Sequence, residues 1–325
     1  MTDAALTGCA LCGEADPLGA GLCPACLGTG AGRRTLLFLR DGTQGDALDP
    51  VLGPVPNRAE IRAALRAGRP LLAVPAAIAA RVLGALEAHG VPARGVPSDR
   101  AWRALPAPFG IMLLAVGGAG AVAGLVAVPA LLWATPVFAL LLLLFALRSL
   151  GRPALSPADD ALPGALRADV AVTLVGIEPG PVRSRLVDLL RIAGPLAAGI
   201  AAQGDPARLR ESIHDLIRAA CDTARETDRL TGTADVIRSS LVWTTEVAGE
   251  EQAGSARSAL RRASELAANG LARMADAVSA LGRIDADAAT LDGPVGAELA
   301  ELTRGLEAAA RVHVETFRAL NELVA

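Results

Sequence analysis

Residues 104–147 read ALPAPFGIMLLAVGGAGAVAGLVAVPALLWATPVFALLLLLFAL, and not one of these side chains is charged. About 20 apolar residues are enough to cross the hydrocarbon core of a bilayer. A single helix over the apolar part of this stretch would be about 58 Å long, roughly twice that thickness. Pro129 and Pro136 fall near its middle, where a chain that turns back needs a break. The stretch therefore predicts a transmembrane helical hairpin over residues 106–150.

Arginines on both sides of this stretch set its predicted orientation. Before it come Arg94, Arg100 and Arg103, and after it come Arg148 and Arg152. Because cytoplasmic flanks are enriched in basic residues, both flanks and both chain termini are predicted to be cytoplasmic. The partner is then a lipid bilayer, and the location is the inner (cytoplasmic) membrane, crossed by two spans. A re-entrant hairpin stays open as an alternative, since the second span is uninterrupted only over 137–147.

The composition of the whole chain agrees with soluble parts joined to a short membrane part. Of its 325 residues, 52% are hydrophobic and 20% are charged, with a net charge of -3. That charge argues against a nucleic-acid partner. Transport is also disfavoured, because proton relays and ion sites normally need a charged residue inside a span. No phosphate loop, dinucleotide fingerprint, HExxH or nucleophile elbow is present, so no small-molecule substrate and no enzyme activity are predicted.

Four of the five cysteines form two C-x2-C pairs near the start of the chain: Cys9 with Cys12, and Cys23 with Cys26. Four thiolates at about 2.3 Å complete a tetrahedral zinc site, which leaves no open position for catalysis. Gly13 suits a tight turn whose backbone amides point back at sulfur. The spacing predicts a structural Zn²⁺ site. Two disulfides, an iron–sulfur site or a redox site are the alternatives; no secretory signal pattern precedes the cysteines, so reduced thiols are expected.

The two cysteine knuckles resemble the small zinc-ribbon heads at the N-terminus of many bacterial membrane proteins. The resemblance covers Cys9 to Cys26 and implies that Cys9, Cys12, Cys23 and Cys26 are the metal ligands. Residues 77–96 show a second, short resemblance to small bacterial α/β domains to which signal transduction has been attributed. It supports a small α/β plait in this part of the chain.

The chain as a whole is predicted to be multidomain and mainly α. Its parts are a zinc ribbon and linker over 1–34, a small α/β domain over 35–105, the transmembrane hairpin over 106–150, a linker over 151–165 and an antiparallel helical bundle over 166–325. Within the α/β domain the expected elements are a strand over 36–39, a helix over 58–67, a strand over 71–74, a helix from Pro75 to His89 and a strand over 91–96.

In the bundle, 3–4 spacing of apolar residues predicts long helices from Asp205-Pro206, over 255–284 and from residues 292–294 to the end. The β-branched segment 166–177 is instead expected to form a strand or a short docking segment. Cys221 lies on an apolar face and is predicted to be a buried neutral thiol. The histidines are predicted to be structural: His89 as a cation near a helix end, and His214 and His313 as helix-contact or rim residues.

These observations favour a membrane-anchored cytoplasmic interaction or scaffold protein. In this hypothesis the zinc ribbon is structural, and the bundle binds an unidentified protein partner or a second copy of itself as a homo-oligomer. One alternative is a zinc- or redox-responsive membrane signalling protein. The other is an enzyme with a site in the helical bundle, although its three histidines are far apart in sequence.

Overall fold

The computed structural model describes residues 8–16, 18–28, 33–40, 48, 51, 58–100, 153–155, 162–200, 206–247, 250–286 and 295–324. The predicted transmembrane hairpin, 106–150, lies outside these residues. Within them, every helix is either too short or too polar to cross a membrane.

The chain divides into two compact units. The helical unit comprises Met1–Glu14, Gly19–Leu22 and Asp159–Ala325, and the sheet unit comprises Ala15–Leu18 and Cys23–Ala158. The fold is mainly helical, as the sequence predicts, and among the described residues the strands form one small antiparallel sheet.

The sheet unit contains three strands in the order β2-β1-β3. Their bounds are Arg34–Leu39 for β1, Leu72–Pro75 for β2 and Ala93–Pro97 for β3. Both outer strands run antiparallel to β1, with Leu36 opposite Ala73 on one side and Val96 on the other. The outer strands are therefore parallel to each other with β1 between them. The connection between them is a 3-10 turn, η2 (Ala76–Ile78), followed by helix α4 (Ala79–Ala88).

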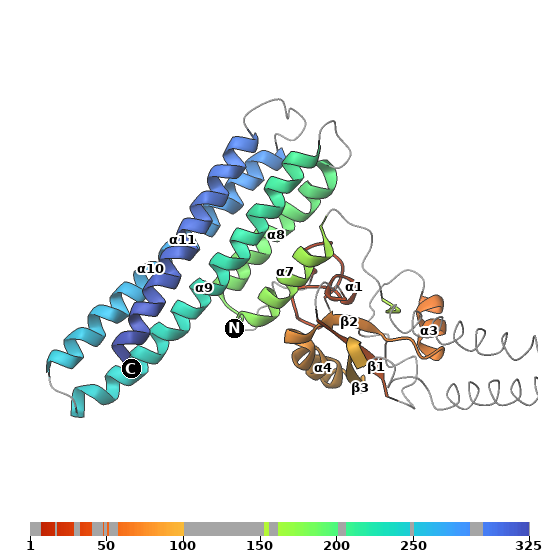
Figure 1. The fold of residues 1–325 in the computed structure, drawn as a ribbon, viewed down its shortest axis with the longest axis horizontal. Helices are drawn as coiled ribbons and strands as arrows, with labels where there is room; N and C mark the ends of the chain where they lie inside the picture. The colour runs from red at the N-terminus through yellow and green to blue at the C-terminus, as the bar shows by residue number, and fades with distance from the viewer. Residues whose placement is uncertain are drawn as a thin grey trace, which may run out of the picture. The chain divides into compact units, whose positions relative to one another are not determined.

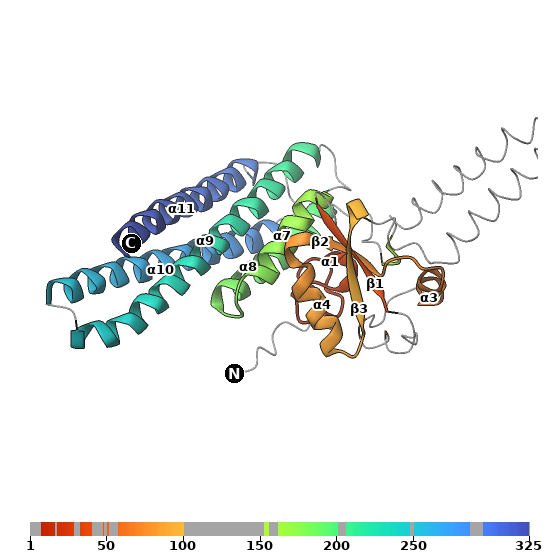
Figure 2. The ribbon, with the colours of Figure 1, turned by 60° about the horizontal axis from the view of Figure 1, so that its bottom comes forward.

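Both faces of this sheet carry buried apolar side chains. Leu36, Phe38 and Ala73 form a small buried cluster on one face. Helix α4 lies on the other face, as Figure 2 shows, and buries Val82 and Leu86. Helix α3 (Arg58–Arg66) completes the predicted order of strands and helices, which is confirmed. The alternation along β1 thus supplies both faces of the sheet, as expected of a strand with period-two side chains.

In the part of the helical unit that the structure describes there are five helices: α7 (Gly164–Gly176), α8 (Pro181–Ile200), α9 (Pro206–Val247), α10 (Glu250–Ala286) and α11 (Val295–Val324). Figures 1 and 2 show α9, α10 and α11 side by side along their length, whereas α7 and α8 accompany only one half of α9. The predicted helices that start at Pro206, span 255–284 and run to the end of the chain are confirmed.

The pattern of buried residues along α9 follows this change in the number of neighbouring helices. Its first half is buried on several sides, through Ile213, Leu216, Ile217, Ala219, Ala220 and Cys221 among others. Between residues 228 and 241, where the burial of α9 is described, only Leu230, Ala234 and Ile237 are buried among its apolar residues, one per turn. A helix with one apolar position per turn packs along a narrow seam like that of a coiled coil. The second half of α9 therefore depends on α10 and α11 alone.

The expectation of a strand or docking segment over 166–177 is wrong, because these residues form helix α7. The helix propensities of Val and Thr are lower than that of Ala by less than about 0.7 kcal/mol per residue. Burial of Val170, Thr173 and Leu174 in the helical unit outweighs this difference. The Thr173 hydroxyl is also satisfied within the helix, because it donates to the Asp169 carbonyl at 2.8 Å.

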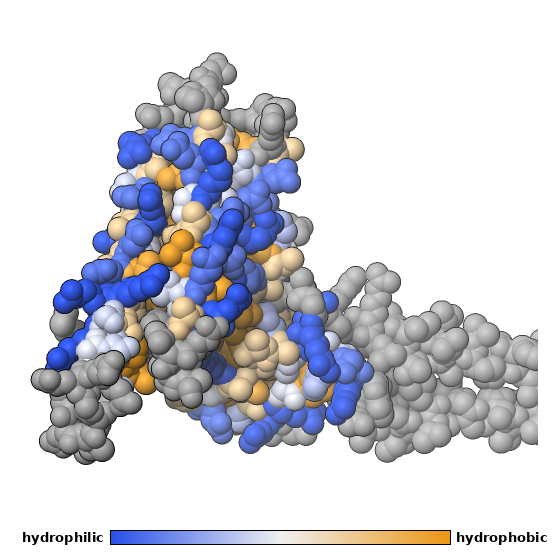
Figure 3. Space-filling view, turned by 60° about the vertical axis from the view of Figure 1, so that its left-hand side comes forward, coloured by the Kyte–Doolittle hydropathy of each residue, from blue (hydrophilic) through white to orange (hydrophobic). Residues whose placement is uncertain are grey.

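One face of the helical unit is mostly polar at its surface. On the face drawn in Figure 3, hydrophilic side chains cover most of the helices and leave small hydrophobic patches between them. Arginines on α9 pair with acids three residues earlier, as Arg229 does with Glu226 at 3.0 Å. This pairing of opposite charges agrees with the solvated helix faces expected from the sequence.

Candidate metal centre

The first cysteine knuckle is a tight turn closed by backbone hydrogen bonds. The Cys9 amide donates to the Glu14 carbonyl at 2.6 Å, and the Gly13 amide donates to the Cys9 carbonyl at 3.0 Å. Gly13 has φ 74°, a left-handed conformation that favours glycine. The expected amide–sulfur contact is made by Leu11, whose amide donates to Cys9 Sγ at 3.4 Å, while the Gly13 amide is engaged by a carbonyl.

The second knuckle is built on a single turn of helix, α1 (Pro24–Leu27). Cys23 is its N-cap, and its Sγ accepts a hydrogen bond from the Cys26 amide at 3.4 Å. Such amide–sulfur bonds stabilise thiolate charge and orient metal ligands. Within the sheet unit, α1 ends against β2, since a Cβ on Gly28 would lie 3.2 Å from Cδ2 of Leu72.

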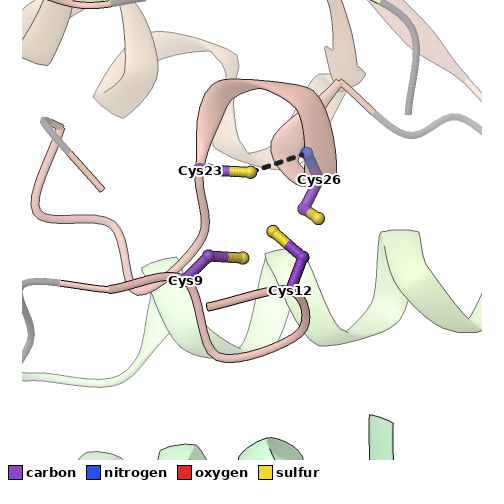
Figure 4. A group of neighbouring side chains, drawn as sticks. All are labelled: Cys9, Cys12, Cys23 and Cys26. Atoms are coloured by element: carbon purple, nitrogen blue, oxygen red, sulfur yellow. Dashed lines mark hydrogen bonds between the residues drawn. The ribbon is translucent and has the colours of Figure 1, made fainter. Parts of the chain in front are cut away.

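The two knuckles bring four sulfur atoms together (Figure 4), from Cys9, Cys12, Cys23 and Cys26. All four sulfurs lie within 4.8 Å of one another, and none is in a disulfide. In a tetrahedral site with metal–sulfur bonds of about 2.3 Å, the sulfurs are about 3.8 Å apart, so the cluster needs only a small contraction to hold a metal ion. The alternative of two disulfides does not describe this arrangement.

Burial of the four ligands is unequal. Cys9, Cys23 and Cys26 are at most 5% exposed, whereas Cys12 is exposed. A metal held here is therefore shielded on three sides and reachable on the fourth. Four thiolates around one divalent ion fill the tetrahedral positions and leave none for a reacting water.

Within the helical unit, the first knuckle and the loop after it rest on α7 and α8. A guanidinium nitrogen of Arg183 donates to the Gly19 carbonyl at 2.9 Å, and one of Arg191 donates to the Gly8 carbonyl at 3.4 Å. Gly194 allows a close approach, because a Cβ there would lie 3.2 Å from the Leu11 carbonyl oxygen. Sequence reasoning missed these contacts, which join residues more than 160 positions apart. The available signal was a glycine followed by Pro195 inside a helix.

The other titratable candidates from the sequence are Cys221 and the three histidines, which lie outside the cysteine cluster. Burial raises the pKa of the Cys221 thiol to about 12, which confirms a buried neutral thiol. The His89 ring lies at the end of α4 and contacts the Ala85 carbonyl at 2.8 Å. His214 is buried on α9, and His313 is fully buried on α11. None of these residues belongs to the four-cysteine cluster found among the described residues.

The cluster is thus the one group of three or more potential metal ligands within reach of each other in the described part of the chain. Comparisons with protein-family models, curated proteins and solved structures found no match to this chain.

Proposed function

We propose that Cys9, Cys12, Cys23 and Cys26 hold one structural Zn²⁺ in a membrane-anchored cytoplasmic interaction or scaffold protein. The observation that carries the proposal is the convergence of four cysteine sulfurs, none of them in a disulfide, from two knuckles on one point. Soft thiolate ligands in a tetrahedral set favour zinc or an iron–sulfur centre over calcium or magnesium. When bound, zinc supplies no reaction here but fixes the ends of two short turns.

Two features support a scaffold rather than an enzyme. The sulfurs occupy all four tetrahedral positions, so the metal is closed to substrate. The helical unit offers extended helix faces covered with paired charges, as on α9, where Arg229 binds Glu226. Long helices such as α9 and α10 can also pack against helices of another protein, and a second copy of the chain is one form that such a partner can take.

The membrane anchor in this proposal rests on the sequence. The uncharged stretch over 104–147 is long enough for two spans, and arginines flank it on both sides. A hairpin of this kind keeps the segments before and after it in the same compartment. A reducing cytoplasm would also keep the cysteines available for metal.

Metal content of the purified full-length chain tests the zinc site. We expect about one zinc per chain by elemental analysis, as for a single closed site. Replacing Cys12 and Cys23 together by Ser should abolish it, because one ligand is removed from each knuckle. The matched control is Cys221→Ser, which lies outside the cluster and should keep the metal. Full zinc retention in the double variant would contradict the assignment.

Membrane topology is tested separately, with a tag at each end of the chain in intact cells. If both termini are cytoplasmic, an external protease should spare both tags until the membrane is permeabilised. Cleavage of one tag alone would leave a single crossing and remove the hairpin from the proposal. Recovery of the untreated chain in the soluble fraction would remove the anchor as well.

The exposure of Cys12 favours a second candidate function, a zinc- or redox-responsive membrane protein. An exposed ligand thiolate is the one that an oxidant or a competing chelator reaches first. In this case a mild peroxide should oxidise two thiolates to a disulfide, be reduced to water and release zinc at low doses. A chromogenic chelator measures that release. Zinc retained until the protein unfolds would leave only the structural role.

A further inference from the structure

Three helices of the helical unit meet at one buried polar layer. The layer consists of Thr227 on α9, Gly270 on α10 and His313 on α11. The side chains of Thr227 and His313 are both 0% exposed. Among the described residues, Oγ1 of Thr227 has no hydrogen-bond partner, and the His313 ring makes no hydrogen bond of normal geometry, with only the Leu266 backbone interacting with it. Buried polar atoms without partners are rare, and each one reduces stability.

The absence of a side chain at Gly270 makes the layer possible. A Cβ built on this glycine would lie 2.3 Å from Oγ1 of Thr227 and 2.7 Å from Cε1 of His313. Both distances are shorter than van der Waals contact. The two polar side chains therefore fill the space over the α10 backbone, and all three helices are in contact at this level.

The groups around the layer give His313 no counter-ion. On the α9 side the neighbours in sequence are Leu230 and Ala234, and on α10 they are Ala263 and Ala267, which together form a buried apolar cluster. Charged residues near this level are Glu226 and Asp228 on α9, Glu265 and Arg273 on α10, and Arg311 and Glu315 on α11. Burial lowers the pKa of His313 and the Leu266 backbone acts in the opposite direction; no charged side chain contributes.

The layer also lies at the level of α9 where the number of helices packed around it changes. Asp228, next to Thr227, has its pKa raised by burial and by the nearby charge of Glu178, which lies in the turn between α7 and α8. Beyond this level α9 is accompanied by α10 and α11 only (Figure 1). We call this part, residues 228–247, 250–270 and 313–324, the three-helix end.

We propose that the layer of Thr227, Gly270 and His313 is a proton-sensitive joint, at which protonation of His313 loosens the three-helix end while the five-helix part stays folded. An imidazolium at this position is a buried cation with no counter-ion, so the charged ring is more stable when it is exposed to water. Because His313 is enclosed by α9 and α10, its exit separates α11 from them. The apolar stripe of Leu230, Ala234, Ala263 and Ala267 is then uncovered.

The direction of the pH effect follows from the direction of the pKa shift. The folded state favours the neutral ring, because burial lowers the pKa of His313. Its stabilising effect is therefore complete above the unfolded pKa of about 6.5 and is lost as the pH falls below that value. Uptake of one proton on opening raises the opening equilibrium constant by up to about tenfold per pH unit in that range.

Hydrogen exchange on the full-length chain tests the joint, with rates corrected for intrinsic pH dependence. Between about pH 7.5 and pH 5.5, peptides from the three-helix end should exchange up to about tenfold more, and peptides from α8 should not change. His313→Leu should abolish the difference. The control His214→Leu, another buried histidine of the same helical unit, should retain it. A pH difference that is missing in the wild type, or that persists in His313→Leu, overturns the proposal.

A direct titration keeps the proposal testable if His313→Leu does not fold. The chain has three histidines, so the His313 ring resonance can be assigned by comparison with single variants of the other two. In the wild-type chain this ring should remain neutral below pH about 6.5, and the signals of the three-helix end should broaden as it titrates. A ring that charges at or above pH about 6.5 without any change in those signals would overturn the joint.

Discussion

The cysteine segment over 8–28 and the seam of α9, α10 and α11 are ordered by different means. The cysteine segment has few buried apolar side chains, such as Leu22 and Leu27, and its four cysteine sulfurs lie within 4.8 Å of one another. In the seam, small and aliphatic residues recur every turn, as at Leu230, Ala234 and Ala267. A short segment with so small a core would need a bound metal for its stability, whereas a long seam takes its stability from many small contacts.

Removal of metal should change the order of the cysteine segment more than any other treatment considered below changes the protein. Structural zinc contributes on the order of 10–16 kcal/mol to folding in isolated zinc-finger peptides, more than any local packing in 8–28 can replace. A strong chelator should therefore abolish hydrogen-exchange protection in this segment while the helical circular dichroism of the seam stays unchanged. If the cysteine segment keeps its hydrogen-exchange protection without metal, then packing contacts order it, as they order the seam.

Thiol reactivity separates the two regions almost as strongly. After metal removal, the four knuckle thiols should react quickly with a thiol reagent, but Cys221 should not. Burial raises the pKa of Cys221 to about 12, so its thiolate is scarce at neutral pH. At pH 8 the thiolate fraction of an ordinary thiol is larger than that of Cys221 by about 1,000-fold or more. The inaccessibility of the buried Cys221 sulfur slows its reaction further. Mass spectrometry of the labelled chain measures this, and rapid labelling of Cys221 in the folded protein would contradict it.

A smaller effect is expected for Gly270→Ala in the seam. The added Cβ would come within 2.3 Å of Oγ1 of Thr227, so the layer must shift. Overpacking typically costs about 1–3 kcal/mol, and the gain in helix propensity of up to about 1 kcal/mol offsets only part of it. We expect a net loss of about 1–2 kcal/mol in the free energy of unfolding, measured with denaturant.

Gly282 on the same helix provides the matched control for this variant. A Cβ there would meet nothing within 4 Å, so Gly282→Ala should stabilise the chain by up to about 1 kcal/mol through helix propensity alone. Opposite signs for the two alanines would show that close packing decides the stability of the seam. Stabilisation by both would mean that the helices do not approach as closely at Gly270.

The smallest effects are expected from two ion pairs of the helical unit. Arg225 on α9 binds Asp169 on α7 at 3.0 Å, with about one third of each side chain exposed. Arg238 binds Asp235 within α9, and both are largely exposed. Asp169→Asn should cost about 0.5–1 kcal/mol and Asp235→Asn less than about 0.5 kcal/mol, because solvent screens the second pair more strongly. Thermal unfolding at low and high salt measures the loss of stability in both variants. A larger loss for Asp235→Asn than for Asp169→Asn would contradict this prediction.

Features encoded by neighbouring residues could be predicted from the sequence. The two C-x2-C pairs marked the cluster because each knuckle is local, and Pro206 marked the start of α9 because proline is favoured in a first helical turn. The strands of the small sheet were also visible, since β1 alternates buried residues between two faces. In each case the physical cause acts within a few residues of the signal.

What could not be predicted depends on contacts between distant segments. The β-branched residues of α7 indicated a strand, and only burial against other helices makes them helical. Gly270 makes room for Thr227 and His313, and nothing in its local sequence indicates this. The support of the first knuckle by Arg183 and Arg191 left no periodic pattern, because each contact joins a single pair of positions.

The bond between Arg191 and the Gly8 carbonyl spans 183 positions of the chain, and this separation has a consequence for biosynthesis. At about 5–20 residues per second, a ribosome needs roughly 10–40 s to add the intervening residues. During that interval the first knuckle has left the ribosome without its helical support. Its thiols must therefore be protected by metal captured early or by the reducing environment of the nascent chain. If the cluster binds a metal, capture of the ion during translation would protect these thiols before α8 is made.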